Sequence, residues 1–375
     1  MLFVFLAAAA AQLFFWGYFL RGALVPDAPS ANAPSPSPSP VSVIVCFRNE
    51  EATLERCLRG ILAQDYSAGF ELLAVDDNST DGSADIVRRL IGEGYHHLRL
   101  LQPGPTRPGK KDALTFGIHN AHHEFLLLTD ADCYPATPEW ITRMTAPLHR
   151  EAALVLGLGL YDSGALFGVT GFQDFESKYV ALKYMGFAQR GLPYMGVGRN
   201  LAYTRTFFVR AGGLEAHADL PGGDDDLLVG GAAREETAAR VVHPDAVTFS
   251  APVETWGAFF RQRRRHQSTG LRYRPVHQLL LGLLALSHGL FFLLGLFLLF
   301  SSWWWLALTV YAVRFWFVCR AYRALYFPAS EAGAPEYVSG LLYAVVWGRV
   351  AYHDALMGPF YMYLGVVGLW PGRGW

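Results

Sequence analysis

Short apolar runs alternate with amphipathic stretches from Val41 onward. The β-branched run VSVIVCF at 41–47 is typical of a buried parallel strand, whereas 50–63 carries apolar residues at helical spacing. Strands joined by helices form right-handed crossovers, so the pattern predicts a mostly parallel α/β sheet covered by helices on both faces. Further strands are expected at 71–75, 98–102 and 124–129, and further helices near 83–91 and 110–121.

Two segments precede this region and differ from it in character. Residues 1–21 are apolar apart from Gln12 and Arg21, and they are long enough to span a bilayer. Arg21 has no basic residue before it, so the positive-inside tendency places the following chain in the cytoplasm; an uncleaved secretion signal is the alternative. Residues 22–40 are rich in Pro and Ser, which predicts an extended spacer rather than a core.

The region 276–375 predicts further membrane helices. The run from Leu279 to Phe300 contains no Asp, Glu, Lys or Arg and is long enough to cross a bilayer. The stretch 338–347 is too short to span and is expected at the membrane interface. The expected membrane helices lie near 279–300, 303–323 and 355–370.

Composition supports a membrane protein and excludes a basic nucleic-acid binder. Hydrophobic residues make up 52% of the chain and charged residues only 17%, below the roughly 25% of soluble domains, so part of the chain is expected in lipid. The net charge of -1 provides no general attraction for nucleic acid. The four cysteines are widely spaced, which predicts free thiols.

Three of the expected strands end in polar clusters, RNEE (48–51), DDNSTDGS (76–83) and DADC (130–133). Ligands of parallel α/β sheets bind beyond the carboxyl ends of the strands. Asp130 and Asp132 are two residues apart at a strand end, so both carboxylates can face one point and hold Mg²⁺ or Mn²⁺, with a diphosphate completing the coordination. The alternative interpretation is a polar turn.

The ordered motifs of the chain resemble those of family 2 glycosyltransferases. They are VSVIVCFRNEE, ELLAVDDNSTDGS, PGKKDALTFGI, FLLLTDADC, GVGRNLAYTRTFF followed by GGL, GGDDDLL and RQRRRH. The resemblance covers about 41–275 and implies the GT-A fold, the Rossmann-like fold of nucleotide-diphospho-sugar transferases, flanked here by transmembrane helices. It identifies 41–275 as the expected catalytic domain, between an anchor at 1–21 with its linker at 22–40 and a membrane region at 276–375.

The resemblance implies a donor site at the strand ends. Asp76 or Asp77 would contact the nucleoside, and the sequence does not separate the two. Lys110 resembles the residue that pairs with the diphosphate, and Asp130 and Asp132 would hold the metal. Asn49 and Glu50 are expected to line the nucleoside pocket, with a helix N-terminus as the alternative role.

The motif GDDDL resembles the segment that supplies the catalytic base. One alignment gives Asp225 and another gives Asp224, and we favour Asp225. Mutual repulsion of three successive aspartates raises at least one pKa and makes that carboxylate a better proton acceptor near neutral pH. A solvated acidic loop is the alternative.

Two further segments are expected to contribute to the site. In RQRRRH, Arg265 would stabilise the departing diphosphate, and Gln262 and His266 would lie on the acceptor side, although His266 replaces the Trp of processive synthases. A basic collar attracted to anionic lipid is the alternative. Residues 198–200 resemble the acceptor-side wall, with Gly198 and Asn200 as its expected contact residues.

The expected function is inverting transfer of a sugar from a nucleotide sugar, with UDP as the expected nucleotide and GDP possible. The acceptor would be a lipid-linked or other saccharide at the membrane, in cell-surface glycan synthesis, with the catalytic domain on the cytoplasmic side of a multi-pass plasma or inner membrane protein. A processive polysaccharide synthase and a non-catalytic membrane scaffold are the alternatives. A cytidylyl- or uridylyltransferase fits less well, because RNEEAT after the first strand is not a Gly-rich, basic phosphate loop.

Overall fold

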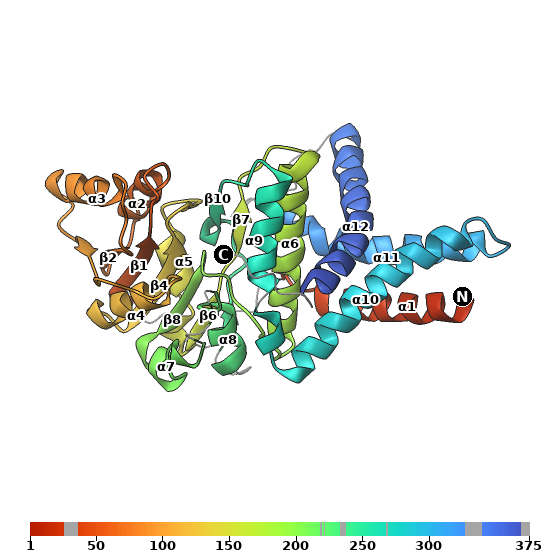
Figure 1. Cartoon of the computed structure of the whole chain (residues 1–375), viewed down its shortest axis with the longest axis horizontal. Helices are drawn as coiled ribbons and strands as arrows, with labels where there is room; N and C mark the ends of the chain where they lie inside the picture. Colours follow the sequence, from red (N-terminus) through yellow and green to blue (C-terminus); the bar gives the residue numbers. More distant parts are fainter. Residues whose placement is uncertain are drawn as a thin grey trace. The chain divides into compact units, whose positions relative to one another are not determined.

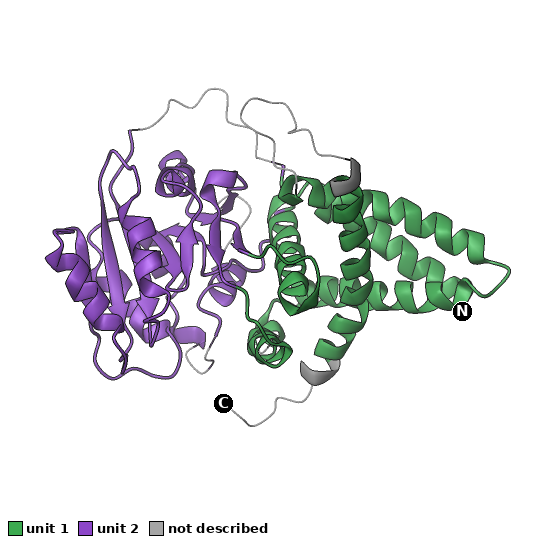
Figure 2. Ribbon diagram, turned by 90° about the horizontal axis from the view of Figure 1, so that it is seen from above, with its two compact units in different colours: residues 1–24, 163–190, 252–375 green, residues 25–162, 191–251 purple. Residues whose placement is uncertain are grey.

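The computed structural model of the chain describes residues 1–25, 37–217, 220, 222–232, 238–267, 269–326 and 340–368 (Figure 1). The chain divides into two compact units, shown in Figure 2. The sheet unit comprises 25–162 and 191–251, and the helical unit comprises 1–24, 163–190 and 252–375. Most of the predicted Pro/Ser spacer, 26–36, lies outside the described residues, as does 369–375.

The sheet unit contains the predicted, mostly parallel sheet. Its strand order is β3-β2-β1-β4-β8-β6-β9, and only β8 runs antiparallel to its neighbours. The strands are β1 (Val41–Phe47), β2 (Phe70–Asp76), β3 (Leu98–Leu101), β4 (Phe125–Asp130), β6 (Leu154–Leu156), β8 (Leu201–Thr204) and β9 (Ala238–Arg240). A smaller sheet has the order β5-β10-β7, from β5 (Cys133–Pro135), β7 (Gly159–Tyr161) and β10 (Thr248–Ser250).

Helices cover both faces of the larger sheet, as predicted. On one face, alternate strand residues such as Val43 and Leu72 share an apolar core with residues of α2, α3 and α5. On the other face, Gly117 of α4 lies against Val75 and Ile44. The α-helices of this unit are α2 (Leu54–Leu62), α3 (Ser83–Gly92), α4 (Lys111–Asn120), α5 (Trp140–Thr145), α7 (Arg205–Arg210) and α8 (Asp226–Ala232). The strands and helices predicted between 41 and 129 are confirmed.

The helical unit contains long helices. The α-helices are α1 (Leu2–Phe14), which continues as a π-helix over Phe15–Leu20, α6 (Gly168–Gln189), α9 (Trp256–Gln267), α10 (Pro275–Leu298), α11 (Trp304–Tyr326) and α12 (Gly340–Gly368). The stretches predicted separately at 338–347 and 355–370 belong, where they are described, to the single helix α12, which contains Pro359. Among the described helices, Leu2–Leu20 and Pro275–Leu298 are long and apolar enough, by length and composition, to cross a membrane.

A buried polar network links four of these helices. Arg314 of α11 is fully buried and donates through Nη2 to Asp354 Oδ1 of α12 at 3.0 Å and through Nε to Gln12 Oε1 of α1 at 2.9 Å. Gln12 in turn donates to Ser287 Oγ of α10 at 2.8 Å. A buried guanidinium needs a charged partner, so this network favours one arrangement of α1, α10, α11 and α12.

Candidate active site

The candidate site residues of the sheet unit come from strand ends that lie side by side. In the register of the sheet, Phe47 of β1 pairs with Asp76 of β2, and Cys46 pairs with Asp130 of β4. β8 runs antiparallel to β4 and begins at Leu201, so the residues just before it reach the same edge. Segments far apart in the sequence therefore converge at the carboxyl ends of the parallel strands, where ligands of such sheets bind.

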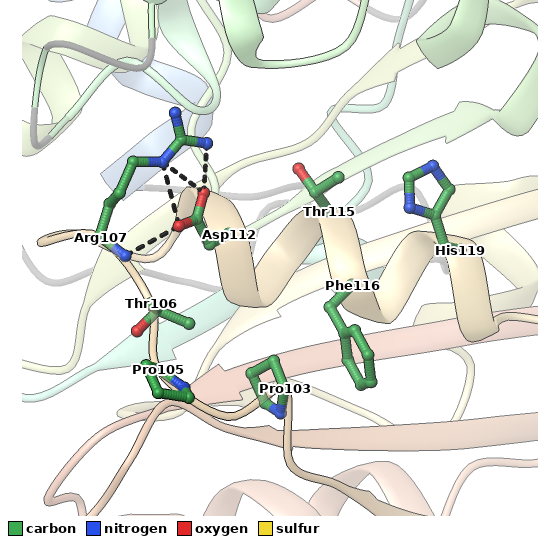
Figure 3. Close-up of a pocket in the computed structure, with 8 residues that line it drawn as sticks. All are labelled: Pro103, Pro105, Thr106, Arg107, Asp112, Thr115, Phe116 and His119. Atoms are coloured by element: carbon green, nitrogen blue, oxygen red, sulfur yellow. Dashed lines mark hydrogen bonds and ion pairs between the residues drawn. The ribbon is translucent and has the colours of Figure 1, made fainter.

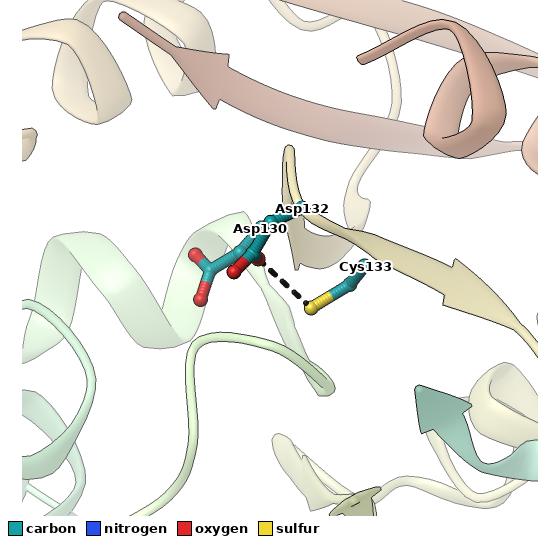
Figure 4. A group of neighbouring side chains, drawn as sticks. All are labelled: Asp130, Asp132 and Cys133. Atoms are coloured by element: carbon teal, nitrogen blue, oxygen red, sulfur yellow. Dashed lines mark hydrogen bonds between the residues drawn. The ribbon is translucent and has the colours of Figure 1, made fainter. Parts of the chain in front are cut away.

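Asp130, Asp132 and Cys133 form a group whose potential ligand atoms all lie within 4.8 Å of one another (Figure 4). The thiol of Cys133 donates a hydrogen bond to Asp132 Oδ1 at 3.3 Å. Burial raises the pKa of Cys133 well above its usual value, and Asp132 and Asp130 raise it further, so the thiol stays protonated. The two carboxylates are therefore the groups of this cluster that could hold a metal ion.

Lys110 lies between two of the predicted carboxylates. Its Nζ is 2.6 Å from Asp130 Oδ1 and 3.0 Å from Asp224 Oδ2. Burial alone would lower the pKa of Lys110, but the charges of Asp130, Asp224 and Asp225 outweigh it and hold the pKa well above its usual value. Lys110 is therefore a fixed cation that connects the predicted metal carboxylates with the GDDDL segment.

Asp225 lies at the start of α8, where its backbone carbonyl accepts the hydrogen bond of Val229 N. Its Oδ2 accepts a hydrogen bond from the backbone N–H of Gly198 at 2.5 Å, and its Oδ1 accepts one from Asp226 N at 2.8 Å. Burial raises the pKa of Asp225 from 3.8 to about 8, and repulsion from Asp224 and Asp226 adds to the effect. Such a carboxylate can accept a proton near neutral pH.

The loops after β1, β2 and β3 are tied together by side chains predicted to line the nucleoside pocket. Asn49 Oδ1 accepts a hydrogen bond from Thr80 N at 2.8 Å, and Asn49 has a left-handed backbone with φ of 58°. Asp76 accepts hydrogen bonds from Ser79 N at 2.8 Å and from Gln102 Nε2 at 2.9 Å, so both of its oxygens are engaged within the protein.

Asp77 and Glu50 differ from Asp76 in their surroundings. Asp77 is buried and accepts a hydrogen bond from the hydroxyl of Thr106, in the loop after β3. Burial raises the pKa of Glu50, and the nearby carboxylates of Asp132 and Asp130 raise it further. Glu50 therefore lies near Asp130 and Asp132, and its backbone N–H donates a hydrogen bond to Ser83 Oγ at 2.9 Å.

The loop after β3 also lines a cavity of about 330 Å³ (Figure 3). Arg107 and Asp112 form an ion pair at its edge, with Arg107 Nη2 2.6 Å from Asp112 Oδ1. None of the predicted metal, diphosphate or base residues lines this cavity, so it is distinct from the carboxylate cluster. The lining residues are Pro103, Pro105, Thr106, Arg107, Asp112, Thr115, Phe116 and His119.

In the segment 198–200, Gly198 lies at the candidate site and Asn200 lies in the core. Gly198 donates to Asp225, and a Cβ at this position would lie 3.0 Å from Lys110 Nζ, so a larger residue would require the cation to shift slightly. Asn200 is fully buried and bonds to Trp140, Leu158 and Ala246. Its side chain is therefore committed to the core, which differs from the acceptor contact expected from the sequence.

Three predicted residues, Gln262, Arg265 and His266, lie on α9 in the helical unit. Gln262 accepts a hydrogen bond from Gln173 of α6 at 3.0 Å, and His266 Nδ1 lies 3.3 Å from Nη1 of the buried Arg263. Arg265 is exposed. The roles of these residues towards donor and acceptor remain predictions.

The residues present fit a hard divalent cation. Asp130 and Asp132 present oxygen ligands close together, which is the chemistry that Mg²⁺ and Mn²⁺ favour. Desolvation raises the pKa of Asp132, and the charge of Asp130 raises it further. A cation held by both carboxylates would offset this repulsion.

The chain matches known proteins over this same region. Residues 42–208 match the family model described as glycosyl transferase family 2. Glycosyltransferase AglE of Haloferax volcanii is 28% identical over 192 residues, covering 51% of this chain and 58% of that protein. "Probable glycosyltransferase YdaM" of Bacillus subtilis is 26% identical over 255 residues, covering 60% of this chain and 54% of that protein. The chain thus spans a little over half the length of these relatives.

A solved structure shares the fold over nearly the whole chain. The mannosyltransferase PcManGT of Pyrobaculum calidifontis, in complex with GDP-Man and Mn²⁺, aligns with a TM-score of 0.61 at 22% identity, covering 99% of this chain and 98% of that chain. The likeness shows the GT-A fold. Together with the family match over 42–208, a little under half of the chain, and the similar glycosyltransferases, it supports a family 2 glycosyltransferase.

Proposed function

We propose that this protein transfers a sugar from a nucleoside diphosphate sugar to an acceptor hydroxyl, with inversion at the anomeric carbon. The observation that carries the proposal is the chain of contacts from Asp130 through Lys110 to Asp224, beside Asp225 with its raised pKa. This chain of contacts connects a group that can bind a charged donor with a carboxylate that can take a proton. Both functions are needed in one site for direct transfer.

Donor binding would use the strand-end loops. Asp77 and Asn49 would face the nucleoside, whereas Asp76 would hold the loop, because both of its oxygens are already engaged. Lys110 would bind the diphosphate as a point charge. Asp130 and Asp132 would hold Mg²⁺ or Mn²⁺, which when bound supplies positive charge to the leaving diphosphate. The bound GDP-Man and Mn²⁺ of the mannosyltransferase PcManGT support this assignment.

Asp225 would act as the general base. It accepts the proton of the acceptor hydroxyl, whose oxygen forms a bond to the anomeric carbon. The bond from this carbon to the diphosphate oxygen breaks, and its electron pair leaves with the diphosphate. One displacement inverts the configuration. Asp224 is less suited to this role, because Lys110 neutralises it through an ion pair at 3.0 Å, whereas Asp225 forms no ion pair with a described cation.

The acceptor would be a lipid-linked or other saccharide at a membrane surface. The two apolar helices of the helical unit support this part of the proposal, because they can hold the chain at a bilayer. Exposed leucines on α10, among them Leu279, Leu283 and Leu286, would face lipid. We propose the domain division predicted from the sequence, with the catalytic region 41–275 on the cytoplasmic side, and a role in cell-surface glycan synthesis.

The proposal is tested by offering the detergent-purified full chain Mn²⁺ and a panel of UDP- and GDP-sugars, and measuring release of nucleoside diphosphate. At least one donor should be hydrolysed slowly even without acceptor, and the double variant Asp130→Ala/Asp132→Ala should lose this activity. Failure of every donor, with acceptor lipids and saccharides also supplied, would argue for a non-catalytic protein.

A further inference from the structure

Arg199 belongs to a segment expected on the acceptor side, but its charge acts on Asp132, one of the predicted metal ligands. Its backbone is fixed from both sheets. The Arg199 carbonyl accepts hydrogen bonds from Thr129 Oγ1 of β4 at 2.8 Å and from Thr248 Oγ1 of β10 at 2.9 Å. The next residue, Asn200, is locked in the core. Position 199 therefore has little freedom to move.

The side chain of Arg199 is held in one direction as well. Nη1 donates a hydrogen bond to Ser250 Oγ at 3.0 Å, and the guanidinium carbon lies 4.7 Å from the centre of the Tyr161 ring. Gly159 makes room for it, because a Cβ there would lie 3.0 Å from the Cβ of Arg199 and 3.3 Å from its Nε. Residues at three strand positions, Gly159, Tyr161 and Ser250, therefore hold this guanidinium in one orientation.

The surroundings of this guanidinium are negatively charged, yet no described carboxylate pairs with it. Burial lowers the pKa of Arg199, but the nearby Tyr161, Cys133, Asp132 and Asp130, in that order, outweigh it and hold this pKa above its usual value. Its one hydrogen bond from the guanidinium to a described residue goes to the neutral hydroxyl of Ser250. The remaining donors of the planar fork are therefore available to a ligand.

We propose that Arg199 binds the terminal phosphate of the donor's nucleoside diphosphate and stabilises it as the leaving group. The inference rests on the proposed function and adds to it a second cation, with Lys110, inside the sheet unit. A guanidinium fork can donate two parallel hydrogen bonds to a phosphate, which a point charge such as Lys110 cannot do. A neutral sugar or acceptor hydroxyl would use this fixed positive charge less well than an oxyanion.

The test compares nucleoside diphosphates with monophosphates. Titration calorimetry with Mn²⁺ first measures the affinity of the full chain for UDP and GDP. The nucleoside that binds more tightly is then used, and its diphosphate is compared with its monophosphate, UMP or GMP. Arg199→Ala should weaken binding of the diphosphate by about 10- to 100-fold, the range expected for hydrogen bonds to a charged group, and leave monophosphate binding unchanged. The diphosphate affinity of Arg199→Lys should lie between those of the unaltered chain and Arg199→Ala. Arg88→Ala, which removes an exposed arginine of α3 paired with Asp85, is the matched charge control.

The outcomes separate this inference from the proposed function. Equal loss of diphosphate and monophosphate affinity in Arg199→Ala would show a structural role, and no loss of either would place Arg199 at the sugar or acceptor; both results overturn the inference while the proposed function stands. If the unaltered chain binds neither diphosphate, the proposed function fails and the inference fails with it.

Discussion

At the scale of single residues, the charge of Asp225 depends on pH in the range where enzymes work. Its pKa of about 8 means that the carboxylate is mostly protonated at pH 6. We expect the transfer rate to rise about tenfold per pH unit up to about pH 8 and then to level off, because only the ionised form accepts a proton. A pH profile of kcat/KM checks this. A rate that is flat between pH 5 and 8 would rule out a base with this pKa.

The same shift links Asp225 to stability. A pKa raised in the folded chain adds stability below the unfolded-state value of 3.8, and this stability is lost as the pH rises through about 8. Asp225→Asn removes the buried charge. The Tm of the variant minus the Tm of the unaltered chain should therefore increase as the pH rises from 4 to 8. Thermal unfolding of both proteins checks this trend. If the trend is found, the variant is folded, and its loss of activity has another cause.

The metal cluster gives a second prediction at this scale. Asp132→Ala should weaken Mn²⁺ binding by at least about tenfold, because one of two carboxylate ligands is lost. Cys133→Ala is the matched control, since the thiol is protonated and is not a ligand in this account. Calorimetric titration with Mn²⁺ in the presence of a nucleoside diphosphate measures both variants. Equal loss in the control would make Cys133 part of the metal site.

The residues whose proposed role depends on local spacing were predictable from the sequence. Asp130 and Asp132 follow from two-residue spacing at a strand end, and Lys110 from its motif. The contact between Ser250 and Arg199 could not be predicted, because the two residues lie 51 positions apart in the sequence. The hydrogen bonds of the Asn200 amide to core residues could not be predicted either, because burial depends on the packed fold.

At the scale of elements, the fit of α4 against the sheet depends on Gly117. A Cβ there would lie 2.9 Å from Val75 Cγ2 and 3.1 Å from Ile44 Cγ2. Gly117→Ala would gain about 1 kcal/mol in helix propensity, but overpacking costs about 1–3 kcal/mol, so we expect a lower Tm. Because Lys110 directly precedes α4, donor affinity should fall as well.

The matched control is Gly92→Ala at the end of α3, where nothing lies within 4 Å of the added methyl. Its Tm should stay equal or rise. Thermal unfolding of both variants checks the comparison, and a Tm for Gly117→Ala above that of the unaltered chain would contradict the packing described here. The alternation of strands and helices was predictable because each period is local. The antiparallel β8 was not, since its orientation depends on pairing with β4 and β6, which lie far from it in the sequence.

At the scale of the whole molecule, the apolar helices bear on where the protein acts. We expect the full chain to stay in the membrane fraction after an alkaline wash and to need detergent for extraction. The double variant Leu283→Lys/Leu286→Lys should lower the membrane-inserted yield, because each charge placed in lipid costs about 2.5–3.5 kcal/mol. Both leucines are exposed, so in a protein that does not enter lipid the same change should be harmless or improve solubility. That result would contradict the membrane assignment.

Length and composition predicted these helices, because the apolar runs are continuous. The buried pairing of Arg314 with Asp354 could not be predicted, since the two residues lie on different helices and charged residues in apolar stretches have many possible partners.

The most direct test of the account is to measure nucleoside diphosphate release and donor affinity together for Asp225→Asn. The account predicts that release from the preferred nucleotide sugar falls by at least about a hundredfold, since general base catalysis contributes 10²–10⁴-fold, while donor affinity with Mn²⁺ stays within about threefold. Undiminished release would remove Asp225 as the base, and Asp224 would be the next residue to test.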